Sequence, residues 1–112
     1  MIPCRNCDGS GFVNRFTVWV TIEYSGHEYE KECDRFNSLE EAIQWYKDRR
    51  YASRLGYFDE HIIRGKIVDE STGSAVREFC GWDRVYRTTY PTGRYQSEYI
   101  GELFSAEERA AF

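Results

Sequence analysis

The chain has 112 residues and a net charge of −4 at pH 7, with 41% hydrophobic and 30% charged residues. This length and balance are typical of one globular domain spanning 1–112 rather than of a disordered chain. An acidic chain is poorly suited to non-specific binding of nucleic acid, which needs a basic surface. No apolar run approaches the roughly 20 residues of a membrane span, and the N-terminus lacks a signal-peptide pattern, so we expect a cytoplasmic protein that does not bind membranes.

The first part of the chain predicts an irregular segment followed by a β-hairpin. Residues 1–12 are rich in Gly and Cys and show no periodicity. Across 15–24 two sets of residues alternate, which is the period of a strand. One set is Phe16, Val18, Val20, Ile22 and Tyr24, and the other is Thr17, Trp19, Thr21 and Glu23. Ser25-Gly26-His27 predicts a turn and 28–34 a second strand. The alternation of that strand is expected to place four acidic residues on one face: Glu28, Glu30, Glu32 and Asp34.

A helix is predicted over 39–55. Ser38 followed by Glu41 matches a capping box, in which the two residues satisfy free backbone donors at a helix start. Apolar residues recur at helical spacing, and acidic residues at the start with basic residues toward the end suit the helix dipole. Gly56 is a natural residue to follow the helix. Ile43 and Tyr46 are expected to face a sheet.

The second half of the chain predicts further strands and a short helix. Segments 62–68 and 75–80 flank a polar turn and form a second hairpin in this interpretation, and 82–90 is a candidate fifth strand. Ser105 with Glu108 predicts a terminal helix over 105–112. The expected fold is α+β, with an antiparallel sheet of four to five strands in a ββαββ-like order packed on one helix, and 15–104 as its core.

Residues 4–11 read Cys-Arg-Asn-Cys-Asp-Gly-Ser-Gly and match the pattern CxxCxGxG. Two residues between the cysteines allow both thiolates to reach one tetrahedral Zn²⁺, and the glycines permit the tight turn. This knuckle resembles the zinc-binding repeat of DnaJ-type chaperones, in which the motif recurs and two copies complete each site. Here the motif occurs once, so the resemblance implies a metal knuckle and not chaperone function.

A complete zinc site needs two ligands beyond Cys4 and Cys7. The remaining cysteines are Cys33 and Cys80. The sequence leaves three interpretations open: a Zn²⁺ site formed by all four cysteines, a Zn²⁺ knuckle at Cys4 and Cys7 alone, or no bound metal. In the last two, Cys33 and Cys80 are buried free thiols that behave as small hydrophobic residues.

Two segments are candidate partner-binding surfaces. The acidic strand over 28–34 carries like charges a few ångströms apart, so it is either a solvated face or a surface that imitates nucleic acid and docks into a cationic groove. The segment over 82–104 interleaves Trp and Tyr with Arg, which are the types most enriched at binding hot spots, although some of its aromatic residues would fill the sheet face. The candidate partner-binding residues of this second segment are Trp82, Arg84, Tyr86, Arg87 and Tyr90.

We expect no catalytic activity, because the chain lacks a nucleophile elbow, a P-loop and the HExxH motif. Its size, acidity and aromatic content are similar in profile to phage-encoded inhibitors of bacterial defence such as the anti-CRISPR proteins. That resemblance implies an inhibitor of a nucleic-acid-processing machine, which binds a partner with a basic surface in the host cytoplasm. The alternative is a zinc-knuckle nucleic-acid-binding accessory protein that uses the Arg/Tyr segment together with a basic helix end. That helix end comprises Lys47, Arg49, Arg50 and Arg54.

Overall fold

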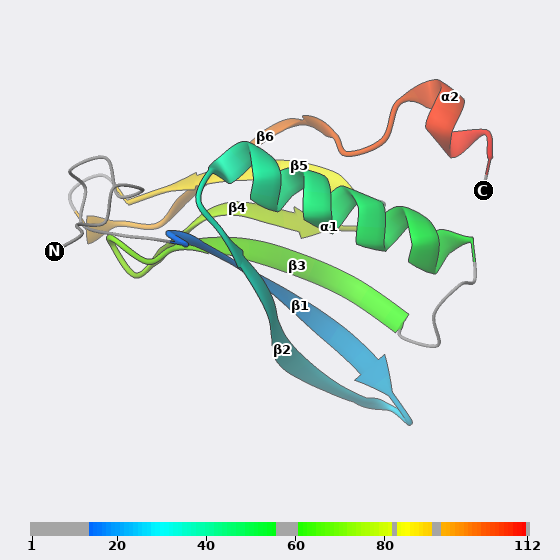
Figure 1. Cartoon of the computed structure of the whole chain (residues 1–112), viewed down its shortest axis with the longest axis horizontal. Helices are drawn as coiled ribbons and strands as arrows, with labels where there is room; N and C mark the ends of the chain where they lie inside the picture. Colours follow the sequence, from blue (N-terminus) through cyan, green and yellow to red (C-terminus); the bar gives the residue numbers. More distant parts are fainter. Residues whose placement is uncertain (1–13, 56–60, 82, 91–92, 112) are drawn as a thin grey trace, which may run out of the picture.

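The computed structural model describes residues 14–55, 61–81, 83–90 and 93–111, which form an α+β fold. One sheet of six strands carries a long helix across one face (Figure 1). The strands are β1 (Phe16–Tyr24), β2 (His27–Phe36), β3 (His61–Asp69), β4 (Ser74–Cys80), β5 (Arg84–Thr89) and β6 (Gln96–Glu102). The helices are α1 (Leu39–Arg54) and α2 (Ala106–Arg109). The predicted fold class is confirmed, and the sheet has more strands than the four to five expected.

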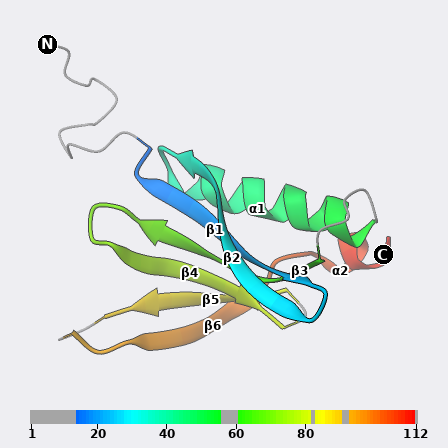
Figure 2. The same cartoon turned by 90° about the horizontal axis from the view of Figure 1, so that it is seen from below.

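The strand order is β2-β1-β3-β4-β5-β6, and every neighbouring pair is antiparallel. Because β1 lies between β2 and β3, those two strands run parallel, and α1 forms the crossover between them. α1 therefore packs on β1, β2 and β3, whereas β5 and β6 extend away from it (Figure 2). The sheet thus has one face partly covered by α1 and an opposite face that no described helix covers.

The turns and helix caps predicted from the sequence are present at most of the expected positions. Ser25 and Gly26 both have positive φ angles, of 52° and 83°, as a two-residue hairpin turn between twisted strands requires. The Ser38 side chain accepts a hydrogen bond of 3.2 Å from the Glu41 N–H at the start of α1. Around α2 the capping box is reciprocal, because the side chains of Ser105 and Glu108 each accept from the other's backbone N–H. Gly56 lies outside the described residues.

The strand missed by sequence analysis is β6. Its residues, Gln-Ser-Glu-Tyr-Ile-Gly-Glu, are almost all exposed and lack the alternation of apolar side chains that marks a half-buried strand. A register shift opposite Val85 and Tyr86 breaks the period further. Pairing with β5, and not local pattern, makes this segment a strand.

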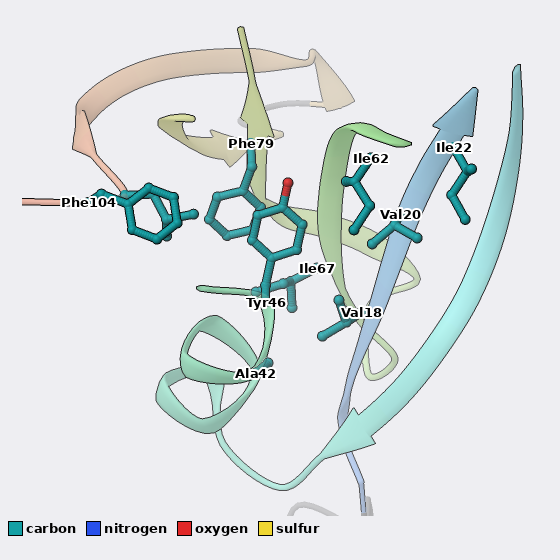
Figure 3. Packing of buried hydrophobic residues seen from close by; sticks show 10 residues of the cluster. Val18, Val20, Ile22, Ala42, Tyr46, Ile62, Ile67, Phe79 and Phe104 are labelled. Atoms are coloured by element: carbon teal, nitrogen blue, oxygen red, sulfur yellow. The ribbon is translucent and has the colours of Figure 1, made fainter. Parts of the chain in front are cut away.

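The core lies between α1 and the central strands, and Tyr46 is its centre (Figure 3). The Tyr46 ring stacks on Phe79, with ring centroids 4.2 Å apart and planes inclined by 16°. Gly65 lies directly beneath this ring, because a Cβ there would be 2.3 Å from Tyr46 Cε1. The prediction that Tyr46 faces the sheet is confirmed, while Ile43 is half-buried at the margin of the same cluster.

A register shift corrects the predicted acidic face of β2. Glu32 pairs with Trp19, but Asp34 pairs with Val18. Directly paired residues point to the same side of a sheet, so Asp34 lies on the α1 side and is separated from the other three acids. The bulge at this point adds one residue to β2. A prediction based on strict alternation does not allow for this extra residue and therefore places Asp34 on the wrong face.

Asp69, at the end of β3, is held by Arg15 through two hydrogen bonds of 2.8 Å, one to each carboxylate oxygen. Ser71 donates to Asp69 Oδ1 from its N–H and its hydroxyl, at 2.9 and 2.6 Å. The hydrogen bond with Arg15 is the largest cause that lowers the pKa of Asp69 from 3.8 to about 2. Because the pKa is lower in the folded protein, the resulting stability is present above pH 4 and is lost as the pH falls toward 2.

Asp69→Asn is therefore expected to lower the free energy of unfolding by about 2 kcal/mol at neutral pH. Urea unfolding of the wild type and the variant across the acid range would measure the difference. The two curves should converge near pH 2, where Asp69 becomes protonated in the folded protein. A difference that stays constant down to that pH would contradict the prediction.

Candidate functional site

The face of the sheet opposite α1, which we call the open face, gathers charged and aromatic residues from all six strands. Residues are assigned to the open face from the cross-strand register, because directly paired residues share a face of the sheet. The residues that define it are Glu28, Glu30, Glu32, Arg35, Trp19, Thr21, Glu23, Arg64, Lys66, Glu78, Cys80, Arg84, Tyr86, Tyr99 and Glu102.

A single row of directly paired residues crosses the whole open face. From β2 to β6 the row consists of Glu32, Trp19, Lys66, Glu78, Tyr86 and Tyr99. Lys66 Nζ lies 6.0 Å from the centroid of the Trp19 ring, at the outer limit of a cation–π contact. A hollow of about 220 Å³ lies beside this row on β1, β3 and β4, with the side chains of Trp19, Lys66, Glu78 and Cys80 in its wall.

Ion pairs across β1 hold the carboxylates of β2. Arg64 Nη2 lies 2.7 Å from Glu28 Oε1, and Lys66 Nζ lies 3.1 Å from Glu30 Oε2. These side chains are exposed, so each pair contributes little to stability, between about 0 and 1 kcal/mol. The open face nevertheless keeps an excess of acid. Its carboxylates are Glu23, Glu28, Glu30, Glu32, Glu78 and Glu102, and its arginines and lysine are Arg35, Arg64, Lys66 and Arg84.

Tyrosines dominate the β5–β6 end of the open face. The rings of Tyr86 and Tyr99 lie 5.7 Å apart between centroids, and Tyr90 and Tyr95 form a similar pair. The Tyr99 hydroxyl donates to Glu102, and the Tyr95 hydroxyl donates to Glu78 Oε1 at 2.5 Å. These hydrogen bonds are the main cause that raises the pKa of both tyrosines. Tyr90, Tyr95 and Tyr99 remain 40 to 53% exposed, so their rings are available for contact.

The structure places the predicted partner-binding residues in different environments. Arg84 and Tyr86 share the open face with the acidic residues Glu28, Glu30 and Glu32. Tyr90 is exposed beside Tyr95. Arg87 and Asp34 lie on the α1 side of the sheet, and Trp82 lies outside the described residues.

Sequence analysis missed Trp19, Lys66 and Tyr99 as members of the same surface. The sequence did contain a clue to Trp19, because it alternates with the apolar residues of β1 and is therefore expected on the face opposite the core. Lys66 alternates with the buried Gly65 and Ile67 in the same way. Neither pattern tells which strands are neighbours, and the common row depends on the strand order.

Most of the predicted basic helix end is engaged inside the protein. Arg50 and Arg54 both bind the carboxylate of Asp83, at 2.5 and 2.9 Å. Lys47 Nζ lies 3.1 Å from Glu108 Oε1. These pairs neutralise most of the cations that a nucleic-acid-binding surface on α1 would use.

The two cysteines inside the described ranges lie on separate strands of the sheet. Cys33 lies on β2 and packs against the core, whereas Cys80 lies on β4 at the open face. β1 and β3 separate the two strands, whose backbones are therefore roughly 14 Å apart. Ligands of one Zn²⁺ must lie within about 2.3 Å of it, which needs the thiols much closer together than these backbones are. A site formed by all four cysteines stays a prediction, and the separation of Cys33 from Cys80 in the sheet does not favour it. Cys4 and Cys7 lie outside the described residues, and a zinc knuckle there stays a prediction.

In the part of the chain that the structure describes, no group of three or more His, Cys, Asp or Glu side chains is arranged to hold a metal ion. None of the described helices is long and apolar enough to cross a membrane. Comparison with protein-family models, with curated proteins and with solved structures finds no match. The charged and aromatic side chains of the open face are therefore the strongest indication of function in the described residues.

Proposed function

We propose that this chain is a small, non-catalytic protein-binding module whose open face binds a partner with a basic surface. The observation that carries the proposal is the excess of carboxylates on a sheet face that also exposes aromatic rings. Aromatic residues supply contact area at the centre of protein interfaces, and complementary charge steers the two partners together. Trp19, Tyr86 and Tyr99 are the expected anchors, because they lie in the row that crosses the sheet.

The finer form of the proposal is an inhibitor of a nucleic-acid-processing machine, acting in the cytoplasm. Glu28, Glu30 and Glu32 occupy alternate positions along β2, roughly 7 Å apart, and form a regular line of negative charge. A groove built to hold a phosphate backbone would accept such a line. Direct binding of nucleic acid is less compatible with this face, because phosphates and carboxylates repel each other.

Arg64 and Lys66 do not prevent this role. They pair with Glu28 and Glu30, and Arg35 Nε lies 3.4 Å from Glu32 Oε2, but exposed ion pairs of this kind are weak. Cations of a partner can therefore replace them at small cost when the interface forms.

The test is a triple charge reversal, Glu28→Lys, Glu30→Lys and Glu32→Lys. We expect it to abolish capture of the partner in a pull-down from the native host, with the captured protein identified by mass spectrometry. The matched control reverses three exposed acids away from the open face: Asp34→Lys, Asp48→Lys and Glu107→Lys. Both variants change the net charge equally, so only the first should lose the partner. The association rate of the wild type should also fall as salt rises, because charges are screened over about 8 Å at physiological ionic strength.

A gel-shift assay with DNA and RNA distinguishes the zinc-knuckle alternative. If the chain bound nucleic acid directly, the open-face reversal would tighten that binding by removing repulsion. That result, or equal loss of the partner in both triple variants, would overturn the proposal. Circular dichroism of each variant confirms that the fold is retained.

A further inference from the structure

Two arginines face each other on the α1 side of the sheet, beyond the region that α1 covers. They belong to a row of directly paired residues: Asp34, Val18, Ile67, Arg77, Arg87 and Glu98. Val18 and Ile67 are fully buried under α1, which packs on β1, β2 and β3. The row continues from Ile67 to Arg77 on β4 and Arg87 on β5.

This arrangement is electrostatically unfavourable within the protein. Like charges directly opposite each other on neighbouring strands are destabilising. Arg87 is compensated by Glu98, whose Oε1 accepts from Arg87 Nη2 at 2.5 Å and from Nε at 3.2 Å. Arg77 is half-buried and donates from Nη1 to the carbonyl of Val76 at 2.8 Å, and it has no carboxylate within ion-pair distance among the described residues.

The surroundings of Arg77 disfavour its positive charge, so a bound anion would stabilise it. Burial and then the charge of Arg87 lower its pKa, and the field of Glu40 opposes them without forming an ion pair in the described structure. Glu98 uses Nε and Nη2 of Arg87, so Arg87 Nη1 has no partner within the described ranges. A hollow of about 320 Å³ beside Arg87 is lined by Thr89, Gln96, Ser97 and the carboxylate of Glu98, which Arg87 neutralises.

We propose that Arg77 and Arg87 form an oxyanion-binding site whose ligand is a phosphate group. Planar guanidinium groups bind phosphate through paired N–H donors. A phosphate monoester carries a charge of about −1.5 to −2 at pH 7, which matches two guanidiniums better than the single charge of a carboxylate. Breaks in local rules of charge placement concentrate at functional sites, and this pair is such a break. The site is separate from the open face and does not depend on the function proposed for it.

The alternative is that Arg77 serves only to pack its aliphatic stem against the sheet. The two roles predict opposite effects of Arg77→Gln. If Arg77 is a ligand-binding residue, the substitution relieves repulsion and raises the Tm measured in chloride by about 1–4 °C. If Arg77 only packs, the same substitution lowers the Tm.

The experiment compares thermal unfolding in inorganic phosphate, O-phosphoserine, acetate and chloride at matched ionic strength. We expect phosphate to raise the Tm of the wild type more than acetate or chloride does, and we expect Arg77→Gln and Arg87→Gln each to remove that difference. NMR titration should show phosphate affinity weakened by about tenfold in each variant. Arg64→Gln, on the open face, is the control and should keep the phosphate effect.

Stronger binding of O-phosphoserine than of inorganic phosphate would identify a phosphorylated side chain as the source of the ligand, and equal binding would identify free phosphate. Either result supports the site. An equal gain in acetate and phosphate would overturn the assignment to phosphate. A phosphate effect that persists in Arg77→Gln, or no phosphate effect in the wild type, would overturn the site itself.

Discussion

Asp83→Asn is expected to lower the free energy of unfolding by about 3 kcal/mol, because it leaves two half-buried guanidiniums without their buried counter-charge. Asp83 lies in the turn before β5 and is 4% exposed. Its two carboxylate oxygens accept from Arg50 Nε at 2.5 Å and from Arg54 Nη2 at 2.9 Å. Arg50 also donates to the carbonyl of Ile62 at 2.7 Å, so the cluster joins the end of α1 to β3 and to the β4–β5 turn.

Asparagine is the informative replacement at this position. Asp83 has a φ of 63°, and asparagine tolerates this left-handed conformation as aspartate does. The substitution therefore removes the charge and leaves the turn unstrained. Urea denaturation measures the loss, with the exposed Asp48→Asn as the control for removing one carboxylate. A loss below about 1 kcal/mol, the range of exposed pairs, would show that solvent already compensates the arginines.

Tyr46→Ala is expected to cost a similar amount, about 3–5 kcal/mol, because it empties the centre of the core. The side chain is 1% exposed and lies against both Phe79 and Gly65. Gly65→Ala should cost about 1–3 kcal/mol by itself, since the added Cβ would clash with the tyrosine ring. Chemical denaturation of each variant provides both values.

The double variant Tyr46→Ala with Gly65→Ala tests whether these two effects share one cause. In the absence of the ring, the new Cβ has space, so the cost of Gly65→Ala should largely vanish. The double variant should then be close in stability to Tyr46→Ala alone. Additive costs within about 0.5 kcal/mol would mean that the two residues act independently and would contradict the packing described here.

Much of the architecture could be predicted from local patterns. Alternation over 15–24 predicted β1, and the turn at Ser25 and Gly26 predicted its hairpin with β2. The caps at Ser38 and Ser105 marked the starts of α1 and α2. Such signals act over a few residues, because periodicity, capping and turn conformation are properties of neighbouring side chains and backbone groups.

The candidate binding surfaces depend on contacts between distant segments. The bulge in β2 moved Asp34 to the other face, and strand order placed Trp19 in one row with Tyr99. Asp83 neutralised two helix cations that lie 33 and 29 residues before it in the chain. Only the register of β4 with β5 brought Arg77 opposite Arg87. Strand register and long-range ion pairs depend on how the whole sheet assembles around its core, so no local stretch of sequence contains them.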